Sequence, residues 1–444
     1  MADLKVTSKG SSEKPRSRKI SWFYSALPYN IGAGPIGTYV QLAILAIYGQ
    51  SLGTIYVGLV VTLFNGVTIP AAMVWGFATD RFYQRRPIIV ASFFLVAGNL
   101  IALLFAHSIY LIAALYGAFS LLSSASATPY NLLIMETEPK PKWATAFANF
   151  SMISSIGTTI GLLLGIFWTD VLPFEWMVIP LAAFSLLSAV LSIVMIKEPP
   201  FVFEREMMVL QKRSFYQRLL AIPMIFLRVP RVSDFRRVFK GMRNELTGHI
   251  PILYLSIVMF YLGGGIFNTS LVPSMYAQRF TEGEVFLVLL IAMVVQIISF
   301  RYIGPYLEKR SLVQTAVSGL AIRSCCYAAI GASVLFLPGL VFMTPMLIFY
   351  PIGAGIAYAT YYTASNTMVF NSLGPRSQGS SLGVYSAMVG TSTMVGSLIS
   401  GFTSFYLGYD TTFVLAALCL VGSAFLTYSL THFKQYQVAA KVLA

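Results

Sequence analysis

Apolar residues form long blocks along the chain, and short polar segments separate the blocks. Six blocks occupy residues 22–49, 54–79, 87–107, 109–135, 143–169 and 174–196. Six more occupy residues 250–278, 284–304, 311–336, 339–370, 380–407 and 411–432. Each block reaches the roughly 20 residues with which an apolar helix crosses a bilayer core about 30 Å thick. The pattern predicts an all-α polytopic membrane protein with twelve transmembrane helices in two six-helix bundles.

The polar segments divide the chain into five parts. They are a basic tail, a first six-helix bundle, a basic linker, a second six-helix bundle and a second tail, at residues 1–21, 22–196, 197–249, 250–432 and 433–444. Lysine and arginine near span ends collect on the cytoplasmic side of a membrane. With twelve spans, 28 of the 30 Lys and Arg residues fall on the side of the two termini. We therefore expect both termini and the linker to be cytoplasmic.

The linker carries 11 of the 30 basic residues. Its apolar residues Phe235, Val238, Phe239 and Met242 share one helical face, with basic residues elsewhere. This pattern favours an amphipathic helix on the anionic cytoplasmic leaflet, so membrane lipids are expected partners. A tether between the bundles is the favoured main role. Nucleic-acid binding would suit the charge, but a segment held between membrane helices argues against it.

The composition also indicates an integral membrane protein, and we expect a multi-pass protein of the plasma membrane. Hydrophobic residues make up 57% of the chain and charged residues 10%, whereas soluble domains hold about 25% charged residues. A single soluble core is excluded. The three cysteines lie in apolar blocks, and the neighbours Cys325 and Cys326 have poor geometry for a disulfide. We expect a monomer without redox chemistry, metal site or cofactor.

A short charged motif after the second block recurs after the eighth block. The copies are G-x-x-x-D-R at Gly76, Asp80 and Arg81, and G-x-x-x-E-K at Gly304, Glu308 and Lys309, 228 positions later. The segments that start at Tyr29 and Tyr261 are also similar, with an offset of 232. A near-constant offset indicates that the chain is a tandem duplication of six helices.

With six plus six helices and this motif, the sequence resembles the major facilitator superfamily (MFS) over essentially its whole length. The resemblance implies two bundles that rock about a central site, and a cytoplasmic gate at the charged motif. Asp80 would face the N-terminal end of the span 380–407, where the helix dipole favours a carboxylate. The arginines would hold carboxylates or lipid phosphates, although they could serve only to fix the topology. The gate residues would be Asp80, Arg81, Arg85, Arg86, Glu308 and Lys309.

Polar side chains inside the apolar blocks mark a candidate substrate pathway. The first and seventh blocks are rich in glycine, and interrupted helices at matching positions of two halves point to a transporter's binding site. The fourth and tenth blocks place polar groups on single helical faces, which favours a shared water-filled cavity. Helix packing, bending and interhelical hydrogen bonds are the alternatives for single residues. The candidates are Asn30, Asn65, Ser120, Ser124, Asn131, Asn268, Gln296, Arg323, Tyr358, Tyr362 and Asn366.

Arg323 is the only formal charge deep inside a predicted span. It follows Arg310 by 13 positions, or about 20 Å of helix, which places it near the middle of the bilayer. Insertion scales assign roughly 2.5–3.5 kcal/mol to such an arginine, so a compensating contact is expected. Three interpretations remain open. The side chain reaches the membrane surface or backbone carbonyls, donates a structural hydrogen bond between helices, or attracts an anionic substrate in the cavity.

Coupling chemistry is not visible in the predicted spans. No Asp, Glu or His lies near the middle of one, although proton-driven transporters commonly carry such a group there. A facilitator, or coupling through an unusual site, is therefore favoured. In the fifth block, the spacing of Gly157, Gly161 and Gly165 favours close helix packing.

These features favour a transporter that moves a small solute across the membrane by alternating access. The solute would be a metabolite, and Arg323 is the one residue that favours an anion. One alternative is an efflux pump for drugs or lipophilic compounds. An alternative of another class is a membrane sensor or lipid-handling protein on the same fold. An enzyme is not expected, because the spans contain neither paired carboxylates nor a Ser/His/Asp set.

Overall fold

The computed structural model describes residues 21–82, 85–138, 142–196, 250–307, 309–337, 339–372 and 378–433. Every regular element within these ranges is a helix, as the apolar blocks predict. The linker 197–249, residues 1–20 and residues 434–444 lie outside them.

The helices follow the predicted blocks closely. The first half contains α1 (Leu27–Ala33), α2 (Ile36–Phe82), α3 (Arg86–Leu103), α4 (Ile109–Thr137), α5 (Trp143–Val171) and α6 (Val178–Met195). The second half contains α10 (Ile250–Ala277), α11 (Glu282–Leu307), α12 (Leu312–Phe336), α13 (Met343–Pro351), the π-helix η5 (Ile352–Ala357), α14 (Tyr358–Ser372), α15 (Gln378–Tyr406) and α16 (Tyr409–Ser429). Short 3₁₀ turns occupy Ser21–Ala26, Phe174–Met177, Gly339–Phe342 and Leu430–His432.

Nine helices within the described ranges are long and apolar enough to cross a membrane. One of them, Trp22–Gly76, covers the first two predicted spans. The predicted spans 339–370 and 380–407 are not among the nine and correspond to α13–α14 and to α15. An all-helical membrane fold is confirmed, and the total of twelve spans stays a prediction.

α2 consists of two helices joined at a kink. Gly49 has φ +72° and ψ 178°, outside the helical region. Residues with a side chain rarely adopt such a positive φ, so glycine suits this corner. The corner lies at the last residue of the first predicted span.

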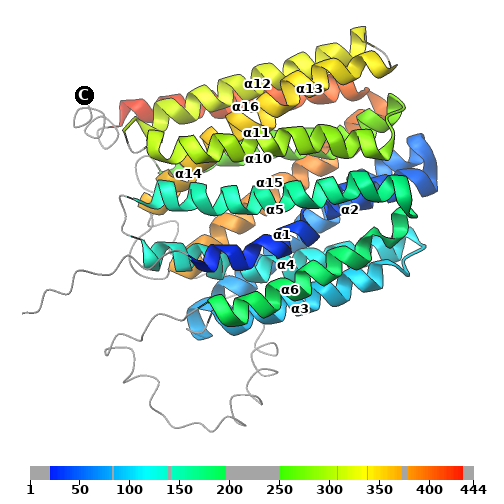
Figure 1. The fold of residues 1–444 in the computed structure, drawn as a ribbon. Helices are drawn as coiled ribbons and strands as arrows, with labels where there is room; N and C mark the ends of the chain where they lie inside the picture. The colour runs from blue at the N-terminus through cyan, green and yellow to red at the C-terminus, as the bar shows by residue number, and fades with distance from the viewer. Residues whose placement is uncertain are drawn as a thin grey trace, which may run out of the picture.

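The two halves of the chain lie side by side (Figure 1). α1, α3, α4 and α6 occupy one side of the molecule, and α10, α11, α12 and α16 occupy the other. The contacts between the halves run mainly along two helix pairs, α2 with α15 and α5 with α11. The tandem duplication would relate α2 to α11 and α15 to α5, so these two interfaces are equivalent in the repeat.

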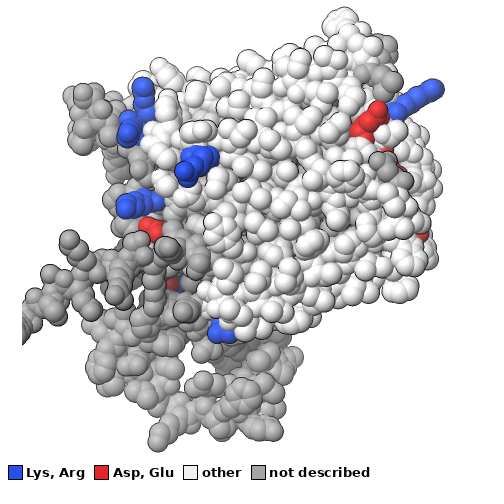
Figure 2. All heavy atoms as spheres, in the orientation of Figure 1, with Lys and Arg blue, Asp and Glu red and all other residues white. Residues whose placement is uncertain are grey.

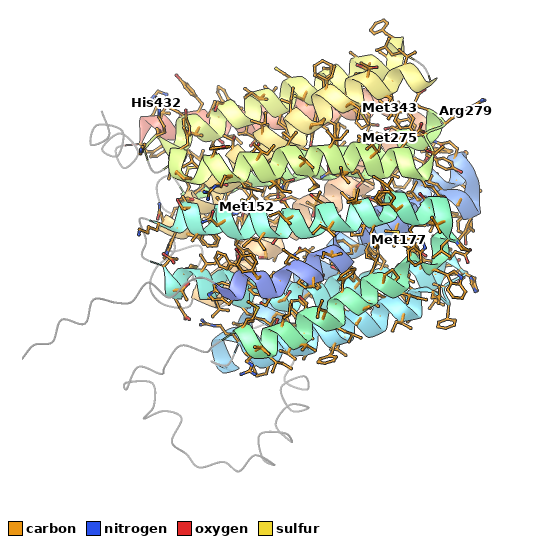
Figure 3. All side chains as sticks on the ribbon, in the orientation of Figure 1. Met152, Met177, Met275, Arg279, Met343 and His432 are labelled. Atoms are coloured by element: carbon orange, nitrogen blue, oxygen red, sulfur yellow. The ribbon has the colours of Figure 1, made fainter. Side chains whose placement is uncertain are left out.

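Charged residues distinguish the two ends of the helices (Figure 2). Arg85, Lys142 and Lys309 lie between helices at one end, which we call the basic end. Arg279 lies at the opposite end, which we call the Arg279 end, and Figure 3 shows it far from His432. This distribution is the one that a cytoplasmic basic end predicts.

Candidate functional site

A cavity of about 270 Å³ lies between the two halves, at the α5–α11 pair. Ligand pockets commonly measure about 300–1,000 Å³, and this cavity lies just below that range, so it suits only a small solute. Four predicted pathway residues line it: Asn131, Gln296, Tyr358 and Tyr362. The other lining residues are Phe147, Phe150, Ser151, Ser154, Ser155, Thr158, Met293 and Phe300.

The cavity has a hydroxyl wall and an aromatic wall. Ser151, Ser155 and Thr158 are four and three residues apart on α5, which places their side chains on one helical face. On the aromatic wall, the rings of Tyr358 and Tyr362 stack with centroids 5.2 Å apart. Such a lining suits a solute with polar and apolar parts. The hydroxyl spacing of α5 is visible in the sequence. The sequence analysis interpreted this block only through its glycines, which predict close helix packing.

Gln296 presents a free carboxamide to the cavity. The residue is only 7% exposed, and it lines the cavity from α11. Its amide has no hydrogen-bond partner among the residues that the structure describes. A solute in the cavity can therefore take the place of that partner.

The two halves touch each other on both sides of the cavity. At the basic end, Phe147 of α5 stacks on Phe370 of α14, with ring centroids 4.4 Å apart. At the Arg279 end, Gly165 of α5 lies against Phe286 of α11, where an added Cβ would be 3.2 Å from the ring. These contacts hold the two halves together on either side of the cavity.

Arg323 lies inside the second half, beside the aromatic wall. It is 4% exposed, and its Nε donates a hydrogen bond to the Tyr327 hydroxyl at 2.8 Å, within α12. Its guanidinium carbon lies 4.9 Å from the ring centroid of Phe260 on α10 and 5.1 Å from that of Tyr358 on α14. The side chain therefore points into the helix bundle and is enclosed by rings, rather than reaching the protein surface.

Three predicted pathway residues form hydrogen bonds between or within helices instead of lining the cavity. Asn65 Nδ2 donates to Ser397 Oγ at 3.0 Å and so joins α2 to α15. Ser120 Oγ lies 2.6 Å from Thr68 Oγ1, which joins α4 to α2. Ser124 Oγ donates to the Ser120 carbonyl within α4. For these residues the structure shows interhelical and intrahelical hydrogen bonds.

The remaining three candidates also lie outside the cavity lining. Asn30 Nδ2 donates to the Ala26 carbonyl at 2.7 Å, next to its own helix. Asn366 Oδ1 accepts a hydrogen bond from the Tyr385 hydroxyl at 3.0 Å, which joins α14 to α15. Asn268 is exposed on α10. The structure does not bring these amides together.

The expected interruption of the seventh block is wrong, and that of the first block is slight. The helix assignment stops only at Gly34 and Pro35, between α1 and α2, and Gly34 keeps helical angles, with φ −58° and ψ −50°. In contrast, α10 is continuous from Ile250 to Ala277. An added Cβ at Gly263 would lie 2.9 Å from the Ala416 carbonyl oxygen of α16. The glycines of α10 therefore permit close packing rather than a break.

The irregular helix of the second half lies in the tenth block. The π-helix η5 separates α13 from α14, and Tyr358 directly follows it. π-Helical turns occur frequently at functional sites. An added Cβ at Gly355 would lie 2.7 Å from Val295 Cγ1 of α11, so this glycine permits a close approach beside the cavity. In the sequence, the residues that could have indicated this irregular helix are Pro351, Gly353 and Gly355.

Two of the residues predicted to form the gate, Arg85 and Arg86, are described at the basic end. Arg85, just before α3, forms a two-pronged ion pair with Glu136 near the end of α4, with Nη2 2.6 Å from Oε1. The resemblance had implied carboxylate partners for these arginines. Arg86 is the first residue of α3 and is half-buried.

The rest of the charged motif is described only in part. Asp80 and Arg81 lie in the last turn of α2, and their side chains are outside the description, as is all of Glu308. Lys309 is exposed in the turn after α11. The predicted contact between Asp80 and the start of α15 thus stays a prediction.

The sequence analysis did not predict a polar contact that lies at the Arg279 end. Gln50 Nε2 donates to the Tyr409 hydroxyl at 2.7 Å and to the Pro273 carbonyl at 3.2 Å. Thr54 Oγ1 lies 3.0 Å from the same hydroxyl. The contact joins α2 of the first half to α10 and α16 of the second. Polar residues at span ends are common, so the sequence alone gives them no special weight.

Comparisons with known proteins agree with this architecture. The family model of the Major Facilitator Superfamily matches residues 30–344. The crystal structure of the human organic anion transporter MFSD10 (TETRAN) is similar with a TM-score of 0.65 and 15% identity, covering 93% of this chain and 100% of that chain. The xylose transporter XylE from E. coli, in a partially occluded inward open conformation, is similar with a TM-score of 0.68 and 13% identity, covering 94% and 98%.

The chain belongs to the Major Facilitator Superfamily, the family that its sequence resembles. This family indicates a membrane transporter rather than an enzyme. At 13–15% identity the two structures carry the fold alone. No match was found among the curated protein sequences.

Proposed function

We propose that this chain moves a small solute across the membrane by alternating access, through the cavity between α5 and α11. The observation that carries the proposal is the place of the cavity, which lies between two halves that touch on both sides of it. Opening one set of contacts while the other stays closed would expose the cavity to one side of the membrane at a time.

We infer that the solute is negatively charged, because Arg323 holds a positive charge behind the wall formed by Tyr358. MFSD10 is described as an organic anion transporter and XylE as a xylose transporter, and likeness in fold does not choose between them. We further propose a monomer in the plasma membrane that contacts anionic lipids at its basic end. Transport is proposed to need no proton or sodium gradient, since no acid or histidine was found near the middle of a predicted span.

The charged motif at the basic end is proposed to be the cytoplasmic gate. A carboxylate at a helix N-terminus contributes about 0.3–2 kcal/mol. Asp80→Asn should therefore slow transport and leave the amount of inserted protein nearly normal. Unchanged transport kinetics in this variant would argue against the gate.

The test of transport uses the purified full chain in liposomes. Uptake of organic anions, sugars and lipophilic dyes is measured with and without proton and sodium gradients. We expect saturable uptake and counterflow of at least one organic anion with no gradient. Uptake of dyes alone would support the efflux-pump alternative, and strict dependence on a gradient would contradict the facilitator.

Two tryptophan variants test the pathway. Ser154→Trp places a large ring inside the cavity and should abolish uptake. Leu163→Trp lies on the same helix, at an exposed position, and should transport like the parent. Equal transport by the two variants, or no movement of any solute by the parent, would contradict the proposal.

A further inference from the structure

The charge of Arg323 has no counter-ion within the part of the chain that the structure describes. The residue is 4% exposed, and Nη1 is buried without a hydrogen-bond partner. A buried cation is costly unless an anion and hydrogen-bond acceptors surround it. The guanidinium is therefore able to bind a negatively charged hydrogen-bond acceptor.

Aromatic rings now take the place of that acceptor. The guanidinium carbon lies 4.9 Å, 5.2 Å and 5.1 Å from the ring centroids of Phe260, Tyr327 and Tyr358. The negative faces of aromatic rings attract a guanidinium, so this shell offsets part of the cost of burial. It leaves the Nη1 hydrogen bond unmade, and a carboxylate or sulfonate would form that bond as well as neutralise the charge.

Tyr358 belongs both to this shell and to the cavity. Its ring covers Arg323 and lines the cavity, where it stacks on the ring of Tyr362. Phe260 and Tyr327 are absent from the cavity lining, so of the three rings around the guanidinium only that of Tyr358 faces a solute. The side chain of Tyr358 is thus the part of the wall that keeps a solute from Arg323.

We propose that Tyr358 determines specificity by covering Arg323. When its ring moves aside, Arg323 binds the anionic group of the solute. The proposal rests on the proposed transport function and adds the residues that recognise charge. The solute is an organic anion with an apolar body. Its anionic group displaces the Tyr358 ring and accepts a hydrogen bond from Nη1, while its body stays against Phe147 and Phe300. A neutral solute of the same shape leaves the ring over Arg323.

A cysteine in the cavity reports the local charge without any transported solute. Ser154→Cys is made in a chain whose three native cysteines are replaced by alanine. The protein, in lipid nanodiscs, reacts with anionic sulfonatoethyl and cationic trimethylammonioethyl methanethiosulfonates, and each rate is divided by the rate with free cysteine. A positive cleft concentrates anions, so we expect about a tenfold preference for the anionic reagent.

Variants assign that preference to the two residues. Tyr358→Ala should increase the preference for the anionic reagent, because the ring between the cavity and Arg323 is removed. Arg323→Gln should remove it, whereas Arg323→Lys should keep most of it, and a merely structural arginine would not give this pattern. A preference that persists in Arg323→Gln overturns the proposal, as does a Tyr358→Ala variant with the parent ratio.

A pair of probes tests binding itself. Benzenesulfonate and benzenesulfonamide have similar shapes and differ in charge. Benzenesulfonate should protect the Ser154→Cys thiol from a neutral maleimide at concentrations at which benzenesulfonamide does not. Equal protection, or none from the anion, overturns the proposal even if Arg323→Gln fails to fold. Labelling needs no transport. A negative result here therefore does not contradict the proposed transport function, and the charge preference can be measured even if no solute is transported.

Discussion

The two interfaces between the halves differ, although the internal repeat makes them equivalent. In the α2–α15 interface, Gly58 and Gly401 face each other, and an added Cβ at Gly58 would lie 2.6 Å from the Gly401 Cα. Small residues opposite each other let two helix backbones approach closely in a membrane. The α5–α11 interface instead encloses the cavity. Midway along the helices, one interface is a backbone contact at Gly58 and Gly401, and the other contains a cavity.

Equivalent positions of the repeat show how this difference arises. Asn65 of α2 and Gln296 of α11 are 231 positions apart, close to the offset of the charged motif. At the same offset of 231, Gly58 of α2 corresponds to Leu289 of α11. Phe286, which precedes Leu289 on α11, packs against Gly165 of α5. At this level α11 carries bulky side chains where α2 carries glycine, whereas nearer the basic end an added Cβ at Gly304 of α11 would lie 2.9 Å from the Thr145 Cα of α5. A duplicated pair of helices can thus yield one tight interface and one binding cavity.

The largest expected effect concerns the tight interface. Gly58→Val places a branched side chain where only backbone fits, and overpacking of this kind costs about 1–3 kcal/mol. We expect a lower thermal unfolding temperature and little transport. Gly98→Val on α3 is the matched control, because nothing lies within 4 Å of an added Cβ there. If both variants unfold at the same temperature, the close contact of α2 and α15 does not stabilise the protein.

The next effect concerns the Arg279 end of the same interface. Tyr409→Phe removes the hydroxyl that joins Gln50 and Thr54 to α16. Loss of a partner from a buried polar group costs about 1–3 kcal/mol, so this end should open more often. Hydrogen exchange of residues 50–57, followed by mass spectrometry, should become faster. The control is Tyr406→Phe, at a position that is 71% exposed, and it should exchange at the rate of the parent. If exchange in Tyr409→Phe is equal to or slower than in the parent, this contact does not hold the Arg279 end closed.

A smaller effect is expected in the cavity. Gln296→Leu removes the free carboxamide and keeps most of the side-chain volume. Since one hydrogen bond contributes about 0.5–1.5 kcal/mol, the apparent KM for the solute should rise roughly 2- to 12-fold. The unfolding temperature should change little, because no protein partner is lost. A large loss of stability with an unchanged KM would show that Gln296 is structural.

The helices and some of their packing could be predicted from the sequence because these depend on local patterns. The length of each apolar block sets a helix, and the glycine spacing of α5 predicted close packing. That packing is confirmed, since an added Cβ at Gly157 would lie 2.6 Å from the Leu27 carbonyl oxygen of α1. Asn131 and Tyr358 were also recognised as cavity candidates from the faces they share with other polar residues.

The rest of the site depends on which helix faces meet, and spacing along one helix does not give that. Asn131 and Asn30 are both amides in apolar blocks, yet only Asn131 lines the cavity. Of the rings around Arg323, that of Tyr327 lies four residues away on α12, but those of Phe260 and Tyr358 come from α10 and α14. A single sequence reveals that a buried arginine needs partners, but it does not identify them.

The smallest expected effect compares the two carboxamides directly. Asn65 donates to Ser397, whose hydroxyl also accepts from Thr269 and donates to the Thr393 carbonyl. Hydrogen bonds between membrane helices average about 0.6 kcal/mol, so Asn65→Ala should lower the unfolding temperature slightly and leave KM unchanged. Ser397→Ala removes all three bonds and should cost more. In a double-mutant cycle the two changes should be less than additive, because they share one bond. If Asn65→Ala instead raises KM as Gln296→Leu does, the solute also passes along α2 and α15, and the contrast between the closed and the open interface would have to be abandoned.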